Sequence, residues 1–122
     1  MSGVFVTGTD TGVGKTLAAC ALLHALARRG LRTAAMKPVA AGSTASATGL
    51  LNEDVAQLSA AATVNAPLAL VNPYCFAPPI APHLAADAAG VRIDIAAIVA
   101  AFRQLSAMAD RTVVEGVGGF CV

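Results

Sequence analysis

The sequence predicts an α/β fold in which a parallel sheet is flanked by helices, and the first 40 residues carry most of that indication. They read as a short apolar run, a glycine-rich loop, a helical pattern and a second apolar run. Two strands joined through a helix are parallel, because the helix carries the chain back to the edge where the first strand began. The length suits one domain, so we expect residues 1–122 to form a single domain.

The first three elements are a strand, a helix and a strand. Residues 4–6 are apolar and meet a glycine turn, which predicts a buried strand. A helical pattern begins at Lys15, and Gly30 is a natural stop for it. Residues 33–36 predict the second strand, which Pro38 ends.

The middle of the chain is less regular. Residues 40–49 are rich in Gly, Ser, Thr and Ala and predict a loop, whereas residues 53–62 predict a short helix. Residues 67–82 contain five prolines. We therefore expect that stretch to lack regular structure and to wrap the surface.

The last elements are a helix and a strand. Asp94 is predicted to cap a helix, and apolar residues follow it at helical spacing: Ile95, Ile98, Val99, Phe102 and Leu105. Residues 111–114 predict a further strand, which ends at Glu115 and a run of glycines.

Composition excludes two classes of protein. The formal net charge of +1 gives no basic field for nucleic acid. Mean hydropathy is high, at +0.70, but 29 residues are Ala, whose methyl groups bury little area. The longest stretch without a charged residue, 55–86, is interrupted by prolines, so no membrane-spanning helix of about 20 residues fits in it. We expect no nucleic-acid partner and no membrane association.

The N-terminus and the cysteines predict a cytoplasmic protein. Residues 1–4 lack the charged start and the long apolar core of a signal peptide. Cys20, Cys75 and Cys121 are an odd number with no CxxC pair, which argues against a disulfide framework or a zinc site. We expect each to be a small buried apolar side chain.

The most informative stretch is residues 8–16, Gly-Thr-Asp-Thr-Gly-Val-Gly-Lys-Thr. Phosphate groups need converging backbone N–H groups, a mobile cation and, where magnesium is bound, a hydroxyl. Lys15 would reach the β- and γ-phosphates of ATP, and Thr16 would ligate Mg²⁺. Five residues separate Gly8 from Gly14 where the strict pattern has four, so Thr9 takes the first-glycine position. A strand before the motif and a helix after it still make it specific.

Lys37 and Glu115 are predicted to share this crevice. Each follows an apolar strand, and ligands of parallel α/β sheets gather at the carboxyl ends of the strands. An acidic residue there is the usual second magnesium anchor, although Asp is more common than Glu. Lys15 and Lys37 are the only lysines in the sequence, which favours a selected ammonium at both positions. The alternative for Lys37 is a solvated strand end.

Five separated motifs resemble those of the dethiobiotin synthetase family. They are residues 8–16, Lys37-Pro38-Val39, Asn72-Pro73-Tyr74, Pro82-His83 and Val114-Glu115-Gly116-Val117-Gly118-Gly119. Their order and spacing match as well. The resemblance covers essentially all 122 residues but only the N-terminal part of the family's longer chain. It implies a P-loop NTPase-like ATP-binding domain that is truncated on its C-terminal side.

The resemblance implies an ATP-dependent ligase of biotin synthesis. Such enzymes convert 7,8-diaminononanoate and CO₂ to the cyclic urea dethiobiotin, and they cleave ATP to ADP and phosphate. One amine captures CO₂ as a carbamate, the γ-phosphoryl group passes to a carbamate oxygen, and the second amine closes the ring. The implied partners are these small molecules with ATP and Mg²⁺, and the complete protein is implied to be a homodimer.

The resemblance also assigns site residues. The implied metal ligands are Thr16, Asp54 and Glu115. The implied catalytic residues are Lys37, Lys15 and Thr11. The nucleotide would contact Gly12, Val13, Gly14, Lys15, Thr16, Glu115, Gly116 and Gly118. The substrate would contact Lys37, Ala41 and Thr11. Without the resemblance, Asp54 would be interpreted as a solvated surface acid.

Two positions depart from the family pattern, and three other functions stay open. Position 12 is often Glu and here is Gly12, and position 41 is often Ser and here is Ala41, so each loses a polar contact near the substrate. The alternatives are a related amidoligase that makes cobyrinic acid diamides, a partitioning-type ATPase switch, and a non-catalytic nucleotide-binding fragment. The switch ATPases carry a signature lysine where this chain has Asp10. We expect the 122-residue chain alone to lack full synthetase activity, which an assay of the purified chain tests.

Overall fold

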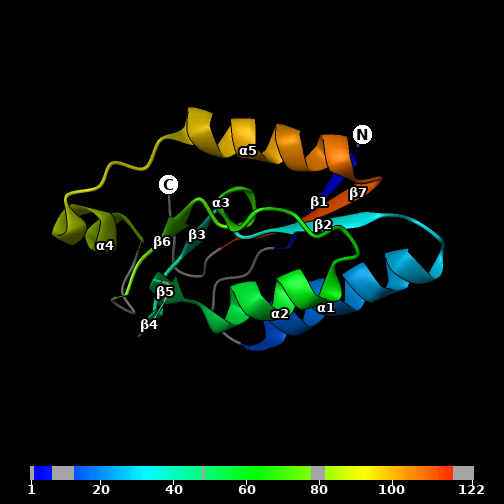
Figure 1. Cartoon of the computed structure of the whole chain (residues 1–122), viewed down its shortest axis with the longest axis horizontal. Helices are drawn as coiled ribbons and strands as arrows, with labels where there is room; N and C mark the ends of the chain where they lie inside the picture. The colour runs from blue at the N-terminus through cyan, green and yellow to red at the C-terminus, as the bar shows by residue number, and fades with distance from the viewer. Residues whose placement is uncertain (1, 7–12, 48, 78–81, 117–122) are drawn as a thin grey trace.

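The computed structural model describes residues 2–6, 13–47, 49–77 and 82–116, and its centre is a three-stranded parallel sheet (Figure 1). The strands, in spatial order, are β1 (Ser2–Val6), β7 (Arg111–Glu115) and β2 (Thr33–Met36). They pair so that Val6 lies opposite Glu115 and Met36 lies opposite Val114. All three carboxyl ends therefore meet at one edge, and the predicted α/β fold is confirmed.

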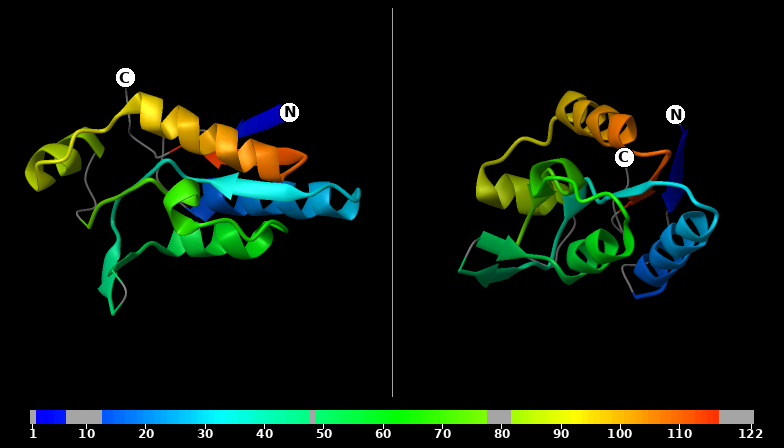
Figure 2. Two further views of the ribbon diagram at one scale, coloured as in Figure 1. Left: turned by 45° about the horizontal axis from the view of Figure 1, so that its top comes forward. Right: turned by 45° about the vertical axis from the view of Figure 1, so that its right-hand side comes forward.

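Helices cover both faces of the sheet (Figures 1 and 2). Helix α5 (Ile95–Met108) lies on one face, and α1 (Val13–Arg28) and α2 (Glu53–Ala61) lie on the other. Strand β2 supplies both layers, because Ala34 packs in the α5 layer and Ala35 packs in the layer of α1 and α2. Strands that are buried on both faces have apolar runs rather than alternation, which explains the unbroken apolar pattern of β2 and β7.

The expectation of a buried strand over residues 4–6 is wrong in part. Strand β1 lies at the edge of this sheet. Val4 and Val6 are half-buried, and Phe5 is 67% exposed.

Helix α1 follows the predicted pattern but begins two residues earlier than Lys15, at Val13. Its Leu23 is fully buried against the sheet. Gly30 has a φ of +80°, in the left-handed region that favours glycine. Its N–H donates to the carbonyl oxygen of Ala27 at 2.9 Å, so the expected glycine stop is confirmed.

Side-chain caps start the two other long helices. The side-chain oxygen of Asn52 accepts from Val55 N at 3.1 Å at the start of α2. Asp94 Oδ1 accepts from Ala96 N at 2.9 Å at the start of α5, as predicted. Such caps satisfy N–H groups that lack a partner within the helix. None of the helices that the structure describes is long and apolar enough to cross a bilayer.

The expectation of a loop over residues 40–49 is wrong in part. Strands β4 (Thr44–Ser46) and β5 (Gly49–Leu51) form an antiparallel hairpin. All three residues of β5 are exposed, so the hairpin has no apolar face whose alternation would indicate a strand.

The expectation of irregular structure over residues 67–82 is also wrong in part. The stretch contains α3 (Leu68–Val71) and β6 (Tyr74–Cys75), and α4 (Pro82–Ala89) begins at its end. Strand β6 pairs in parallel with β3 (Val39–Ala40), which lies just beyond β2 along the chain. That pairing joins residues far apart in the sequence, so the proline content of residues 67–82 does not reveal it.

An ion pair joins the amino ends of β2 and β7. The Asp110 carboxylate accepts from Arg32 N at 2.8 Å and from the Arg32 guanidinium at 3.3 Å. These hydrogen bonds, the backbone one first, lower the pKa of Asp110 below its ordinary value of 3.8. The pair lies at the end of the sheet opposite to the predicted site.

Candidate active site

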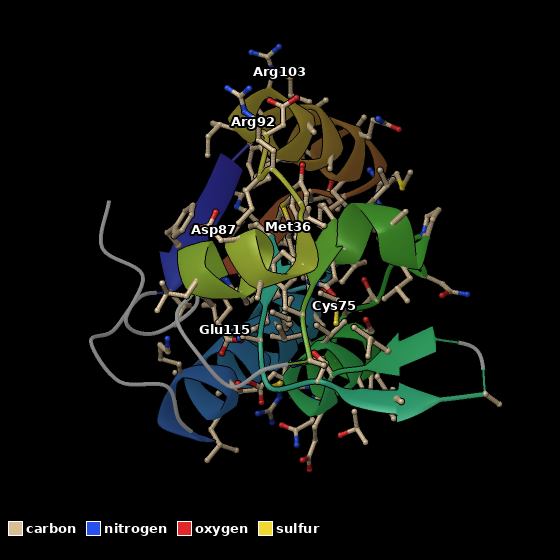
Figure 3. All side chains as sticks on the ribbon, turned by 90° about the vertical axis from the view of Figure 1, so that its left-hand side faces the viewer. Met36, Cys75, Asp87, Arg92, Arg103 and Glu115 are labelled. Carbon is tan, nitrogen blue, oxygen red and sulfur yellow. The ribbon has the colours of Figure 1, made fainter. Side chains whose placement is uncertain are left out.

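Four predicted site residues meet near the carboxyl ends of β2 and β7, the end of the molecule that faces the viewer in Figure 3. Glu115 is the last residue of β7, and Lys37 directly follows β2. Thr16 lies near the start of α1, and Asp54 lies in the first turn of α2. The site is therefore assembled from two strand ends and two helix starts, as expected for a parallel α/β sheet.

Glu115 is the centre of the cluster and is fully buried. Its Oε1 accepts from the hydroxyl of Thr16 at 2.7 Å, and its Oε2 accepts from Lys37 Nζ at 2.8 Å. A carboxylate removed from water is stable in a fold only where such partners surround it. Both oxygens of Glu115 meet that condition.

Lys37 is buried as well, and its ammonium lies between two carboxylates. Beside the 2.8 Å contact to Glu115, its Nζ lies 3.4 Å from Asp54 Oδ2. The side chain of Asp54 is 41% exposed, so this second contact is more strongly screened by water. The alternative that Lys37 is a solvated strand end is wrong, and Asp54 is a paired, partly exposed acid.

Of the remaining predicted site residues, some lie in the segments next to this cluster and others lie outside the described residues. Lys15 Nζ donates to the carbonyl oxygen of Gly116 at 3.0 Å, which brings the loop lysine to the end of β7. Val13 and Gly14 form the start of α1. Ala41 is half-buried after β3, and its carbonyl oxygen accepts from the Asn52 amide at 3.3 Å. Three predicted residues lie outside the described residues: Thr11, Gly12 and Gly118.

The negative charge of the cluster reaches Cys20, which lies one helical turn beyond Thr16 in α1. Burial raises the pKa of the Cys20 thiol, and the charges of Glu115 and Asp54 raise it further. The expectation of buried cysteines is wrong in part for Cys20 and Cys75, which are both half-buried. Cys121 lies outside the described residues.

The oxygen donors of the cluster fit Mg²⁺. Two carboxylates and a hydroxyl are the hard ligands that this ion prefers. In the structure both carboxylates contact the cationic Lys37 ammonium, and the Thr16 hydroxyl donates to Glu115. Among the described residues no group of three or more His, Cys, Asp or Glu side chains gathers. If Mg²⁺ binds here, Thr16, Asp54 and Glu115 are the side chains that would hold it, with phosphate or water oxygens as the other ligands.

A separate, open pocket of about 420 Å³ lies beside α4 and the start of α5. It is lined by Asp87 and Arg92, both labelled in Figure 3, and by small or apolar neighbours. None of the predicted site residues lines it. The cluster around Glu115, and not this pocket, brings together the residues that are predicted to bind phosphate and metal.

Comparison with known proteins places the chain in a family. The model of the AAA domain family matches residues 2–122. The chain belongs to the AAA domain family. This family match supports the predicted P-loop fold, in which Lys15 and Thr16 follow the phosphate loop.

Three curated relatives of the chain carry the same functional name. The chain is 58% identical to the ATP-dependent dethiobiotin synthetase BioD of Ralstonia nicotianae over 97% of the chain and 52% of that protein. It is 56% identical to the protein of the same name from Aromatoleum aromaticum, over the same shares. For that of Xylella fastidiosa, the identity is 51% over 98% of the chain and 53% of the relative. The chain thus spans about half the length of the curated relatives it matches, and the resemblance to dethiobiotin synthetases is confirmed.

Two asparagines support the site of this AAA domain although no role was predicted for either from the sequence. Asn52 caps the helix that carries Asp54. Asn72 donates to the main chain of Lys37. The only signal for Asn72 is its place in the Asn72-Pro73-Tyr74 motif. Asn52 could have been found as a helix cap, because it directly precedes the predicted helix 53–62.

Proposed function

We propose that the protein is a dethiobiotin synthetase, which joins 7,8-diaminononanoate and CO₂ into dethiobiotin and cleaves ATP to ADP and phosphate. The observation that carries the proposal is the buried Lys37–Glu115–Thr16 cluster, in a chain 58% identical to a protein of that name. We also propose that residues 1–122 form one ATP-binding domain, and that the complete protein is a cytoplasmic homodimer.

In this proposal the residues of α1 bind the phosphates of ATP. Lys15 places its ammonium at the β- and γ-phosphates, and Thr11 and the backbone of Gly12 to Gly14 complete the cradle. Thr16, Asp54 and Glu115 would hold Mg²⁺, which would supply charge to neutralise the phosphate oxygens in phosphoryl transfer. Gly116 and Gly118 border the nucleotide after β7.

Lys37 is the residue that we propose acts on the reacting groups. Its ammonium contacts Glu115 and Asp54, the carboxylates that would hold Mg²⁺, and from the same place it would contact the anionic carbamate and the γ-phosphate. Phosphoryl transfer needs positioning and charge neutralisation more than a protein nucleophile. The γ-phosphoryl group passes to a carbamate oxygen, and the second amine then attacks the carbonyl carbon and expels phosphate. Lys37, Thr11 and Ala41 would contact the substrate.

The test is an assay of the complete protein with 7,8-diaminononanoate, bicarbonate, Mg²⁺ and ATP. We expect the wild type to form dethiobiotin, and Lys37→Ala to lose nearly all product while it still binds ATP. Lys15→Ala is the matched control, because it removes the other ammonium and should weaken ATP binding itself. A wild-type protein that forms no dethiobiotin would contradict the proposed function. Wild-type rates in Lys37→Ala would remove Lys37 from the reaction.

A further inference from the structure

The segment from Val71, the last residue of α3, to Tyr74 is hydrogen-bonded to both the N–H and the carbonyl of Lys37. Lys37 N donates to the carbonyl oxygen of Val71 at 2.8 Å. The side-chain amide of Asn72 donates to the carbonyl oxygen of Lys37 at 2.7 Å and to that of Tyr74 at 2.9 Å. Asn72 is buried, at 8% exposure, so water does not easily replace these bonds.

These contacts fix the main chain at Lys37. Its N–H and its carbonyl are both hydrogen-bonded to the same short segment, and Pro38 restricts its backbone to extended conformations. The Lys37 side chain is only 6% exposed, so its rotamers are limited by packing. The place of its ammonium between Glu115 and Asp54 therefore depends on where the main chain is held.

We propose that Asn72 is a positioning residue for Lys37. Its amide fixes the Lys37 carbonyl, and through it the ammonium, at the carboxyl end of β2. The effect on the reaction rests on the proposed function, in which Lys37 acts on the carbamate and the γ-phosphate. The effect on the position of Lys37 does not depend on the proposed function.

Thr63 provides a matched control because it holds the other end of the same strand. Thr33 N, at the start of β2, donates to Thr63 Oγ1 at 2.8 Å, and Thr63 N donates to Thr33 Oγ1 at 3.0 Å. Thr63→Ala loosens β2 far from Lys37, whereas Asn72→Ala loosens it at Lys37. A general loss of strand stability would affect both variants alike.

The first experiment measures how readily Lys37 reacts with a small amine-acylating reagent, with Lys15 as the internal reference in peptide mapping. We expect Asn72→Ala to raise the ratio of Lys37 to Lys15 labelling by up to about tenfold, the change in local opening that one lost hydrogen bond produces. Thr63→Ala should leave the ratio unchanged. Asn72→Ser, whose hydroxyl can serve one carbonyl, should lie between and replaces Asn72→Ala if that variant does not fold. An unchanged ratio in the Asn72 variants, or an equal rise in Thr63→Ala, overturns the proposal.

The second experiment follows dethiobiotin formation by the complete protein. We expect Asn72→Ala to lower kcat by about tenfold with the KM for ATP unchanged, because the phosphate loop is untouched. Thr63→Ala should retain the wild-type kcat. If wild type makes no dethiobiotin while the labelling result holds, the proposed function fails and the positioning of Lys37 stands. A wild-type kcat in Asn72→Ala, in an active enzyme, overturns the positioning role.

Discussion

Replacing Lys37 by Met should destabilise the metal-free protein by about 3 kcal/mol. The side chains of Lys37 and Glu115 are 6% and 1% exposed, and their charged atoms are 2.8 Å apart. Removing one partner of a buried ion pair costs about 3–5 kcal/mol, because the other charge stays buried without compensation. Thr16 still donates to Glu115 at 2.7 Å, which places the expected loss at the lower end of that range.

Urea unfolding in the presence of EDTA measures this loss. The chain contains no Trp, so far-ultraviolet circular dichroism is the suitable signal. Arg103→Met is the control, since it removes an exposed positive charge and should change the free energy of unfolding by no more than about 0.5 kcal/mol. The double variant Lys37→Met/Glu115→Gln should regain most of the stability, because it leaves no uncompensated buried charge.

Magnesium extends the same experiment to the proposed metal site. Addition of Mg²⁺ should stabilise Lys37→Met more than wild type, because the metal then has the carboxylates of Glu115 and Asp54 to itself. The reasoning is refuted if Lys37→Met unfolds like wild type in EDTA. It is equally refuted if the double variant is no more stable than the single one.

Three further predictions concern other parts of the fold. Glu115→Gln should lower the pKa of Cys20 and speed its alkylation at a fixed pH, because it removes a negative charge that raises that pKa; a pH series of iodoacetamide labelling checks this. Asp110→Asn should flatten the fall of Tm at acid pH, since a carboxyl whose pKa is lowered on folding stabilises the protein above its unfolded pKa and loses that contribution as the pH falls through the folded one; melting curves from about pH 5 down to below the ordinary value of 3.8 test it. Leu23→Ala should cost about 2–5 kcal/mol by leaving a cavity, whereas Leu17→Ala on the exposed side of the same helix should cost far less, as urea unfolding would show.

Sequence reasoning succeeded where burial leaves a local pattern. Lys37 and Glu115 end apolar runs, and parallel topology brings the ends of such runs together, so their meeting could be predicted. Asp54 could not be found in this way. Its place depends on α2 packing against α1, a contact between elements that the residues around Asp54 do not encode.

The regions that were predicted wrongly lack a local sequence pattern that would reveal their structure. Strand β6 is two residues long, and its partner β3 lies far away in the sequence, so the pairing has no local signature. The exposed β5 offers no apolar alternation to detect. The role of Asn72 was missed for a similar reason, because its side chain donates a hydrogen bond to a residue 35 positions earlier in the sequence.

The level ends of the central strands restrict where the chain can gain or lose residues. Strands β2 and β7 start in register, with Thr33 opposite Arg111. The number of residues in each strand therefore determines where Lys37 and Glu115 lie. One residue inserted within β2 would turn each side chain that follows it to the opposite face, and Lys37 would then point away from Glu115. Insertions and deletions should therefore be tolerated in the turn around Gly30, which precedes β2. Between Thr33 and Lys37 they should disrupt the contact of Lys37 with Glu115.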